Sequence, residues 1–242
     1  MPVRIRHPWI QCAVAVLIAV SGVLRATSAA QAAPATTIAL TINQRQAVVN
    51  GDTVTLDTAP ILDESAGRTF VPVRFIGETL GAYIGWNGDE QKVTYIAGDT
   101  RIDLWIGRRT AQVNGQEVTL DVAPFVDENS RTLVPVRFVS EQMGAAVGWD
   151  GPTQTVTVTA PWVGRLVVMH NRAFSPATLQ IAAGTRVTWV NLDRSTHDVF
   201  GPDFESPGLG REQAYSHTFM QAGTFTYACS YHEDMAATIV VD

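Results

Sequence analysis

The sequence contains very little cysteine: two residues in 242, Cys12 and Cys229. Cys12 lies in an N-terminal apolar run that we expect to be removed, so the mature chain would hold one cysteine and form no internal disulfide. A lone thiol in an oxidising compartment is exposed to unwanted oxidation. We therefore expect Cys229 to be buried or bound.

Long apolar runs are also lacking. The N-terminal run follows Arg4 and Arg6, ends near Leu24 and precedes Ala30-Gln31-Ala32, an order typical of a secretory signal peptide over residues 1–32. It is shorter than the ~18 residues that a membrane-spanning helix needs, and no later run is long enough. We expect an extracytoplasmic mature protein, secreted, periplasmic or on the cell surface, with no membrane span.

Basic residues are scarce as well. Lys and Arg number 17 against 23 Asp and Glu, for a formal net charge of -6, which excludes the basic footprint of a nucleic-acid or anionic-lipid binder. Hydrophobic residues make up 46% of the chain, which is enough for packed cores. Histidine occurs five times and is absent between residues 33 and 160.

Two segments repeat within that histidine-free region. "VNGDTVTLDTAPILDESAGRTFVPVRF" matches "VNGQEVTLDVAPFVDENSRTLVPVRF" at an offset of 64 residues, which becomes 63 from Arg68 and Arg131 onward. A match of this length indicates two copies of one folding unit. Asn50-Gly51 and Asn114-Gly115, flanked by alternating apolar residues, predict tight hairpins in both copies.

A short helix is predicted after each "VPVRF". Three apolar residues fall at helical spacing in each copy, and a glycine can close each helix. These are Val73, Ile76, Leu80 and Gly81 in the first copy, and Val136, Val139, Met143 and Gly144 in the second. Trp86 and Trp149 then open another hairpin. Each repeat is thus predicted to be a small antiparallel sheet with one short helix.

The repeats, over residues 37–97 and 98–160, resemble the copper amine oxidase N-terminal-like domain, a stalk module of exported bacterial proteins. The resemblance rests on "R-T-[FL]-V-P-V-R-F" and "G-A-x-[IV]-G-W". It does not imply amine oxidase catalysis, which needs a three-histidine copper site. We interpret Arg74 with Glu78, and Arg137 with Glu141, as ion pairs along a helix. A cell-envelope component is a candidate partner of the repeats.

From about Leu166 the pattern changes to short alternating strands separated by turn residues. Such spacing is typical of an all-β sandwich, predicted over residues 165–242. The linker "APWVGR" is short, so we expect the sandwich to abut the second repeat. The chain as a whole is predicted to be mainly β.

Ligands for a metal collect near the C-terminus in "YACSYHEDM". The period of two in "TFTYAC" points Cys229 inward at a strand end, and His232 and Met235 follow at the spacing C-x2-H-x2-M. "NLDRSTHDVF" supplies a second nitrogen, His197, on the loop after another strand. One thiolate, two imidazoles and a weak axial thioether are the donor set of a blue-copper site.

This C-terminal part resembles a cupredoxin of the amicyanin and pseudoazurin kind, since "HTFMQAGTFTYACSYHEDM" follows F-x3-G-x-[FY]-x-Y-x-C-x2-H-x2-M. The resemblance implies a Greek-key β-sandwich with one copper ion per chain. It makes His197, Cys229 and His232 the in-plane ligands and Met235 the axial one. It also implies electron transfer with a redox partner protein rather than enzymatic turnover.

Two positions depart from the family pattern. Asp198 stands where asparagine is common after the first histidine, and an ionised carboxylate cannot donate a hydrogen bond between the ligand loops. Tyr231 replaces a frequent proline, which predicts a less rigid loop. His170 and His217 are interpreted as ordinary surface or strand residues.

Two functions remain open from the sequence. The first is an exported electron carrier whose repeats act as a spacer or surface-docking module. The second is an extracytoplasmic copper-storage or sensing protein whose repeats mediate cell-surface interaction. Zinc is a poorer occupant because structural zinc sites usually draw on more thiolates. The absence of Met-rich or His-rich segments argues against a copper chaperone.

Overall fold

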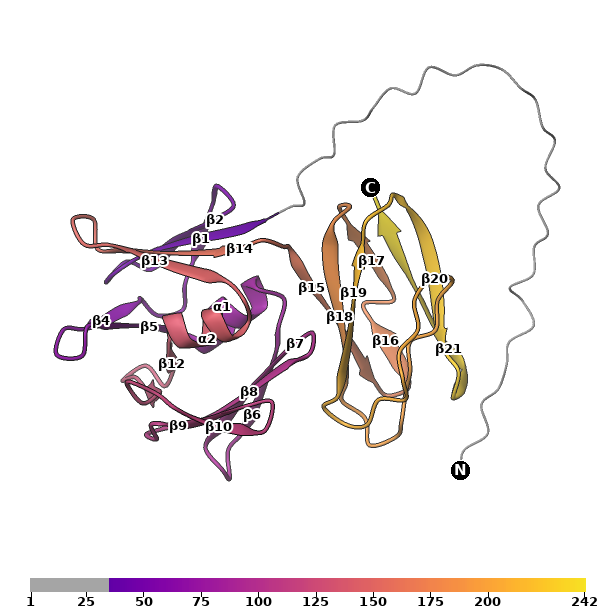
Figure 1. The fold of residues 1–242 in the computed structure, drawn as a ribbon, viewed down its shortest axis with the longest axis horizontal. Helices are drawn as coiled ribbons and strands as arrows, with labels where there is room; N and C mark the ends of the chain where they lie inside the picture. The colour runs from indigo at the N-terminus through magenta and orange to yellow at the C-terminus, as the bar shows by residue number, and fades with distance from the viewer. Residues whose placement is uncertain (1–34) are drawn as a thin grey trace, which may run out of the picture.

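The computed structural model describes residues 35–242. The predicted signal peptide, residues 1–32, lies outside the described residues. The N-terminal part consists of three sheets and two short helices. It lies beside a C-terminal sandwich (Figure 1). The predicted mainly β fold is therefore confirmed. None of the helices in the described region has the length and apolar character needed to cross a membrane.

Three antiparallel sheets form the N-terminal part, called the stalk below (residues 36–160). The first has the order β13 (Ala146–Asp150), β14 (Thr155–Ala160), β1 (Thr36–Thr41), β2 (Gln46–Val49) and β3 (Asp52–Thr55). The second has the order β10 (Gln116–Thr119), β9 (Thr110–Val113), β8 (Thr100–Trp105), β7 (Lys92–Ala97) and β6 (Tyr83–Asn87). The third has the order β11 (Phe125–Val126), β12 (Thr132–Pro135), β5 (Arg68–Pro72) and β4 (Ile61–Asp63).

The local elements of both repeats form as predicted. Asn50 and Asn114 have φ of 52° and 51°, and the glycines after them also have positive φ, which two-residue hairpin turns of this kind require. The helices are α1 (Val73–Thr79) and α2 (Val136–Gln142). Gly81 and Gly144 follow them in the left-handed conformation, with φ of 77° and 90°.

The repeats exchange strands, which corrects the expectation that each closes its own sheet. In the first sheet β1 of repeat one pairs with β14 of repeat two, with Thr36 opposite Ala160. In the third sheet β5 pairs with β12, with Val71 opposite Val134. One hydrophobic core contains buried residues from Ile38 to Ala160. The two repeats are therefore one packed unit, because neither buries its apolar faces alone.

The C-terminal part is a β-sandwich, as predicted. One sheet has the order β16 (Ala173–Ser175), β15 (Gly164–His170), β18 (Thr185–Asn191) and β19 (Ala214–Phe219). The other has the order β17 (Thr178–Ile181), β21 (His232–Val241) and β20 (Gly223–Cys229). Between them lies a core of large aromatic residues. The rings of Trp189 and Tyr227 meet edge to face there, with their centroids 5.6 Å apart.

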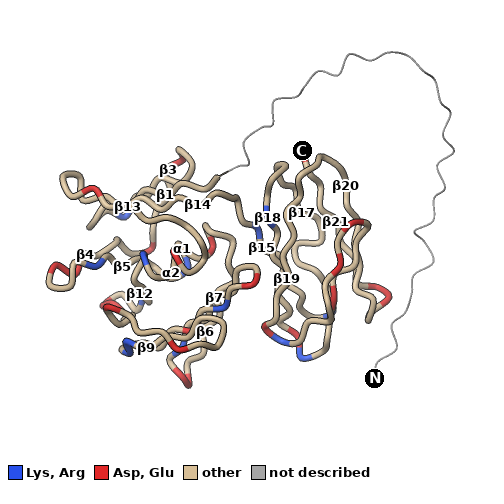
Figure 2. Tube along the Cα trace, viewed as in Figure 1, with Lys and Arg blue, Asp and Glu red and all other residues tan. Residues whose placement is uncertain are grey.

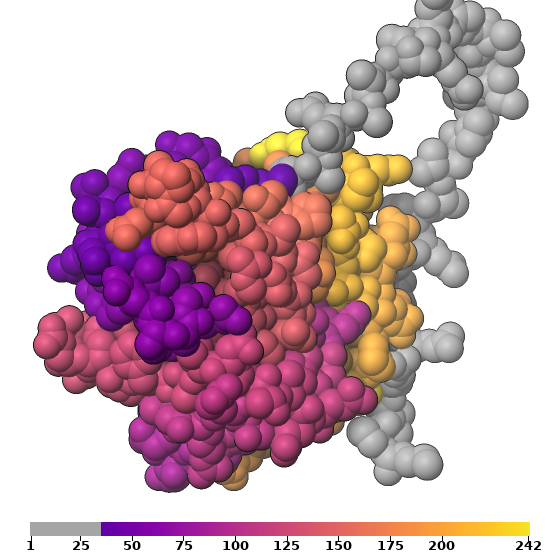
Figure 3. Space-filling view, turned by 60° about the vertical axis from the view of Figure 1, so that its left-hand side comes forward, coloured from indigo at the N-terminus to yellow at the C-terminus, as the bar shows by residue number. Residues whose placement is uncertain are grey.

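The stalk packs directly against the sandwich, as the short linker predicts. The guanidinium of Arg186 donates to the Ala97 carbonyl at 3.2 Å, and the Gly98 N–H donates to Thr188 Oγ1 at 3.2 Å. Figure 3 shows the two parts in contact in the space-filling view. Thr188 on β18 is buried, so the outer face of that strand is covered. Figure 2 shows acidic residues spread over both parts.

Candidate metal centre

Two hairpin strands place three of the four predicted ligands. β20 ends at Cys229, and β21 begins at His232 and contains Met235. The ladder is irregular between Ala228 and Cys229, and Cys229 then stands opposite His232 across a tight turn. The sequence spacing C-x2-H-x2-M thus becomes a compact cluster because the chain reverses between the cysteine and the histidine.

The fourth ligand, His197, comes from the loop after β18. It is held by an isolated bridge to Leu209, in which the His197 N–H donates to the Leu209 carbonyl at 3.1 Å and the return bond measures 2.7 Å. The imidazole is 0% exposed. Its place is therefore set by backbone contacts with a loop twelve residues further on.

The ligand atoms converge on one point. Cys229 Sγ lies 3.7 Å from Nδ1 of His197 and 3.6 Å from Nδ1 of His232. The coordinating atoms of these three residues all lie within 4.8 Å of one another. Met235 is 1% exposed and belongs to the same buried core cluster as Cys229. The structure thus brings together the predicted His-Cys-His set, with the methionine side chain buried in the same core.

These distances fit a bound first-row metal ion. With metal–sulfur and metal–nitrogen bonds of ~2.3 Å and ~2.0 Å and an angle of ~120°, the sulfur and nitrogen atoms would be about 3.7 Å apart. The observed separations of 3.7 and 3.6 Å match this value. Two imidazole nitrogens and one thiolate sulfur, with a buried methionine in the same core cluster, are the donor chemistry of copper rather than of a hard cation.

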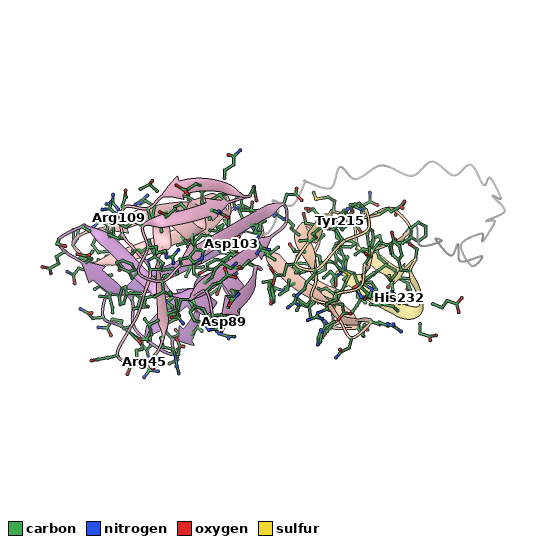
Figure 4. The ribbon with its side chains drawn as sticks, turned by 90° about the horizontal axis from the view of Figure 1, so that it is seen from below. Arg45, Asp89, Asp103, Arg109, Tyr215 and His232 are labelled. Atoms are coloured by element: carbon green, nitrogen blue, oxygen red, sulfur yellow. The ribbon has the colours of Figure 1, made fainter. Side chains whose placement is uncertain are left out.

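His232 differs from the other three residues in its exposure. Cys229 and His197 are fully buried, whereas His232 is only partly buried. Figure 4 shows His232 on the side of the sandwich away from the stalk. Burial, followed by the nearby His197, lowers the pKa of His232, and burial also raises the pKa of the Cys229 thiol. One ligand edge therefore reaches the surface from an otherwise closed site.

Asp193 holds the far side of the His197 ring, and it was not among the residues predicted from the sequence. Its Oδ2 lies 2.9 Å from His197 Nε2, and Ser195 Oγ lies 3.1 Å from the same nitrogen. Although burial raises it, hydrogen bonds from the N–H groups of Arg172 and Asn171, and from His197, lower the pKa of Asp193 to about 2. The carboxylate is thus ionised and orients Nδ1 of His197 toward the sulfur. Its position four residues before a predicted ligand was the only sequence signal.

Asp198 ties the two ligand loops together despite being unable to donate. Ser230, directly after Cys229, donates its N–H to Asp198 Oδ1 at 2.6 Å and its hydroxyl to Oδ2. Asp198 is 0% exposed. The carboxylate therefore still connects the two loops, because the direction of the hydrogen bonds is reversed. The cysteine loop supplies the donors, and the histidine loop supplies the acceptor.

Asn191 is a second supporting residue that was not predicted from the sequence. Its amide nitrogen donates to the carbonyls of Ser195 and Leu209, each at 2.8 Å, and the side chain is fully buried. These two bonds hold the segment just before His197 and the segment that forms the backbone bridge with it. Tyr231, at the expected proline position, packs against Gly208, where an added Cβ would lie 2.7 Å from the tyrosine oxygen.

The two remaining histidines of the described chain lie outside the metal cluster. His170 Nδ1 is 3.3 Å from Asp193 Oδ1 at an exposed position. His217 stacks on Phe204 with ring centroids 5.0 Å apart, and burial lowers its pKa. Their predicted assignment as ordinary surface or strand residues agrees with these contacts.

Comparison with known families gives two matches along the chain. The copper amine oxidase N-terminal domain matches residues 64–158, and a cupredoxin-like domain matches residues 152–241. The first match runs across both repeats and does not separate them. This agrees with the exchanged strands of the stalk.

Individual relatives match the C-terminal part. The chain is 37% identical over 90 residues to amicyanin-alpha of Methylorubrum extorquens, covering 34% of this chain and 76% of that protein. It is 35% identical over 87 residues to amicyanin of Paracoccus denitrificans, covering 33% of this chain and 66% of the relative.

Solved structures give matches of the same extent. An oxidized amicyanin variant is 30% identical with a TM-score of 0.31, covering 32% of this chain and 80% of that one. A purple cupredoxin from Nitrosopumilus maritimus is 28% identical with the same TM-score, covering 32% and 98%. By its sequence relatives and its His-Cys-His cluster, the chain belongs to the amicyanin-like cupredoxins, with a copper amine oxidase N-terminal domain preceding the cupredoxin domain.

Proposed function

We propose that this protein is an exported blue copper protein that carries single electrons between redox partners. The observation that carries the proposal is the convergence of Cys229 Sγ with the Nδ1 atoms of His197 and His232 at 3.7 and 3.6 Å. Met235 would supply a thioether sulfur as the fourth ligand. Copper bound here would supply a one-electron couple with a covalent bond to sulfur.

The protein contributes a ligand set that is held in place from several sides. Asp193 fixes the His197 ring, Asp198 joins the histidine loop to the cysteine loop, and Asn191 fastens the segments around His197. Ligands that cannot rearrange favour electron transfer, because both oxidation states must accept one geometry. Buried Cys229 and His197 are shielded from exogenous ligands, which disfavours substrate turnover at the metal.

The partly exposed edge of His232 is the proposed route for electrons. It belongs to the same cluster as the buried sulfur and reaches the surface on the side away from the stalk. A redox partner can therefore approach this edge without displacing the stalk. The stalk then acts as a spacer or surface-docking module in an extracytoplasmic protein, after removal of residues 1–32.

The test is a visible spectrum of residues 33–242 after addition of Cu(II), followed by voltammetry. We expect one copper per chain, an intense thiolate-to-copper absorption band and reversible reduction and reoxidation. A protein that binds copper without that band, or that shows the band but cannot be cycled reversibly, would instead be a storage or sensing protein.

A further inference from the structure

Two grooves in the stalk are copies of one another. The first, of about 530 Å³, lies between the start of α1, strand β6 and the β11–β12 connection. The second, of about 340 Å³, lies between the start of α2, strand β13 and the β4–β5 hairpin. Their lining positions correspond through the repeat offset, so the internal symmetry of the stalk builds the same hollow twice.

Each groove combines side chains from both repeats. It carries a tryptophan and a helix arginine from one repeat and a second arginine from the other repeat. The first groove has Trp86, Arg74 and Arg131, and the second has Trp149, Arg137 and Arg68. Because the second arginine of each groove comes from the other repeat, neither groove would exist if the repeats folded separately.

The tryptophans are exposed but held in place. Trp86 is 49% exposed and Trp149 is 44% exposed, among the largest apolar side chains on the surface. In each case a Cβ added to the turn glycine, Gly88 or Gly151, would lie 3.6 Å from the indole Nε1. Each indole thus rests against its hairpin turn at the side of a groove. A fixed, exposed indole is typical of a binding surface.

The strands that carry the tryptophans have a free edge. β6 and β13 are the terminal strands of their five-stranded sheets. Arg137 Nη1 donates to the Val147 carbonyl of β13 at 2.9 Å, so a backbone acceptor of that edge is within reach of the groove side chains. Such an acceptor is what an added strand would use.

The two copies of this arginine differ. Arg137 is folded onto its strand and also pairs with Glu141 at 3.0 Å. Within residues 35–242, the Arg74 guanidinium has no corresponding contact, and its groove is the larger one. The arginine therefore occupies a backbone acceptor of the strand edge in the second groove and not in the first.

Each groove is lined by two arginines and one carboxylate, which is Asp57 in the first and Glu64 in the second. The chain is acidic, with a formal charge of -6, yet four arginines gather at these two sites. The arginines that come from the other repeat form ion pairs with carboxylates at the surface. Arg131 pairs with Asp57 at 2.8 Å, and Arg68 pairs with Asp121 at 2.5 Å. Exposed pairs of this kind contribute little and exchange readily for another carboxylate.

We propose that each groove binds one extended acidic peptide segment, which adds a strand to the edge of β6 or β13. Carboxylate side chains of the peptide pair with the two arginines of the groove, and an apolar side chain rests on the indole. The free backbone edge favours a peptide over a sugar polymer, because hydrogen-bonding groups along a strand are spaced for another backbone. Two sites per chain permit bivalent attachment of the stalk.

The experiment uses residues 33–242 and a blocked eight-residue peptide of alternating glutamate and valine. Calorimetry should give two peptides per chain, with Trp86→Ala and Trp149→Ala each reducing this to one. Arg74→Gln should weaken binding at its groove by about tenfold or more, the loss of a charge-assisted bond. Arg108→Gln, an exposed arginine outside both grooves, is the matched control and should bind normally.

Circular dichroism and thermal melting check that each variant is folded. The proposal is overturned if the peptide does not bind, or if it binds equally well to the Trp86→Ala and Trp149→Ala double variant. Equal affinity for a glutamine-valine peptide would also overturn it, because the arginines would then play no part. Binding of polygalacturonate, with none of the peptide, would make the grooves sugar sites instead.

Discussion

Arg101 of the stalk and Glu212 of the sandwich form an ion pair, with Nη2 and Oε2 3.0 Å apart. Arg101 also binds the buried Asp103 through Nε at 2.8 Å. On the sandwich side, the Glu212 N–H donates to the Asn191 carbonyl at 2.6 Å. Since Asn191 fastens the segments around His197, the stalk contact continues by hydrogen bonds into the loop of a metal ligand.

Removing the two partners of this pair should have unequal effects. Arg101→Gln leaves the Asp103 carboxylate buried without its cation, so we expect the free energy of unfolding to fall by about 1–3 kcal/mol. Glu212→Gln disturbs a half-exposed pair, so it should cost less than ~1 kcal/mol. Urea denaturation of both variants measures this, and the reverse order would show that Asp103 does not depend on Arg101.

Cys229→Ser should leave the sandwich folded but remove the blue colour. Serine keeps nearly the size of the thiol at a strand end, so the core around it is preserved. Cu(II) should still bind weakly through His197 and His232, without an intense thiolate band or rapid reversible electron transfer. Absorption spectra and voltammetry check this. An intense band that survives the change would show that the band does not come from a bond between copper and the Cys229 thiolate.

Met235→Leu should be milder. Leucine has a similar volume, so the fully packed position should tolerate it with a loss below ~1.5 kcal/mol. An axial thioether bond is long and weak, so the colour should persist while the reduction potential changes. Voltammetry of copper-loaded protein reads the potential. A potential identical to that of the unmodified protein would place Met235 in the core without a ligand role.

Asp198→Asn should raise the reduction potential, because the buried carboxylate favours the more positive, oxidised site. Asparagine also offers one acceptor oxygen where Asp198 accepts two bonds from Ser230, so stability should fall by about 1 kcal/mol. Ser230→Ala is the control: it removes one of those bonds and keeps the charge, so the potential should change less. An unchanged or lowered potential in Asp198→Asn, with the spectrum intact, contradicts the electrostatic account.

Tyr227 should make the protein sensitive to high pH. Burial raises the pKa of Tyr227 to about 12, against about 10 in an unfolded chain, so its contribution is constant below pH 10. Between pH 10 and 12 the unfolded state ionises first, and about 2–3 kcal/mol of stability is lost. Tyr227→Phe should remove this part of the loss.

At pH 7 the same change should be neutral or slightly stabilising, because the buried hydroxyl faces the Trp189 indole without forming a hydrogen bond of normal geometry among the described residues. Denaturation of both proteins at pH 7, 10 and 11.5 measures the difference between them. Parallel curves over this range would show that Tyr227 is not held neutral by burial.

Features that depend on neighbouring residues were predictable from the sequence. The turns at Asn50 and Asn114 need only positive φ at adjacent positions, and the helices after "VPVRF" need only apolar residues at a fixed spacing. Cys229 and His232 lie on one reversed hairpin, so their spacing alone places them together.

The supporting contacts of the site were less predictable. Ser230 and Asp198 are 32 residues apart, and Arg101 and Glu212 are 111 apart. Ser230, Asn191 and Glu212 are ordinary polar residues in the sequence, with no motif to distinguish them. Their roles depend on which loops the fold brings into contact.

The sequence by itself determined the repeated stalk unit, the sandwich and the His-Cys-His donor set with its methionine, because these depend on local periodicity and residue chemistry. Tertiary structure alone decided that the repeats exchange strands and which residues of the stalk meet the sandwich. The physical reason is that alternation along a strand shows which face is buried, while the strand that pairs with it is chosen by the packing of the whole core. The composite grooves and the link from Arg101 toward His197 follow from that choice.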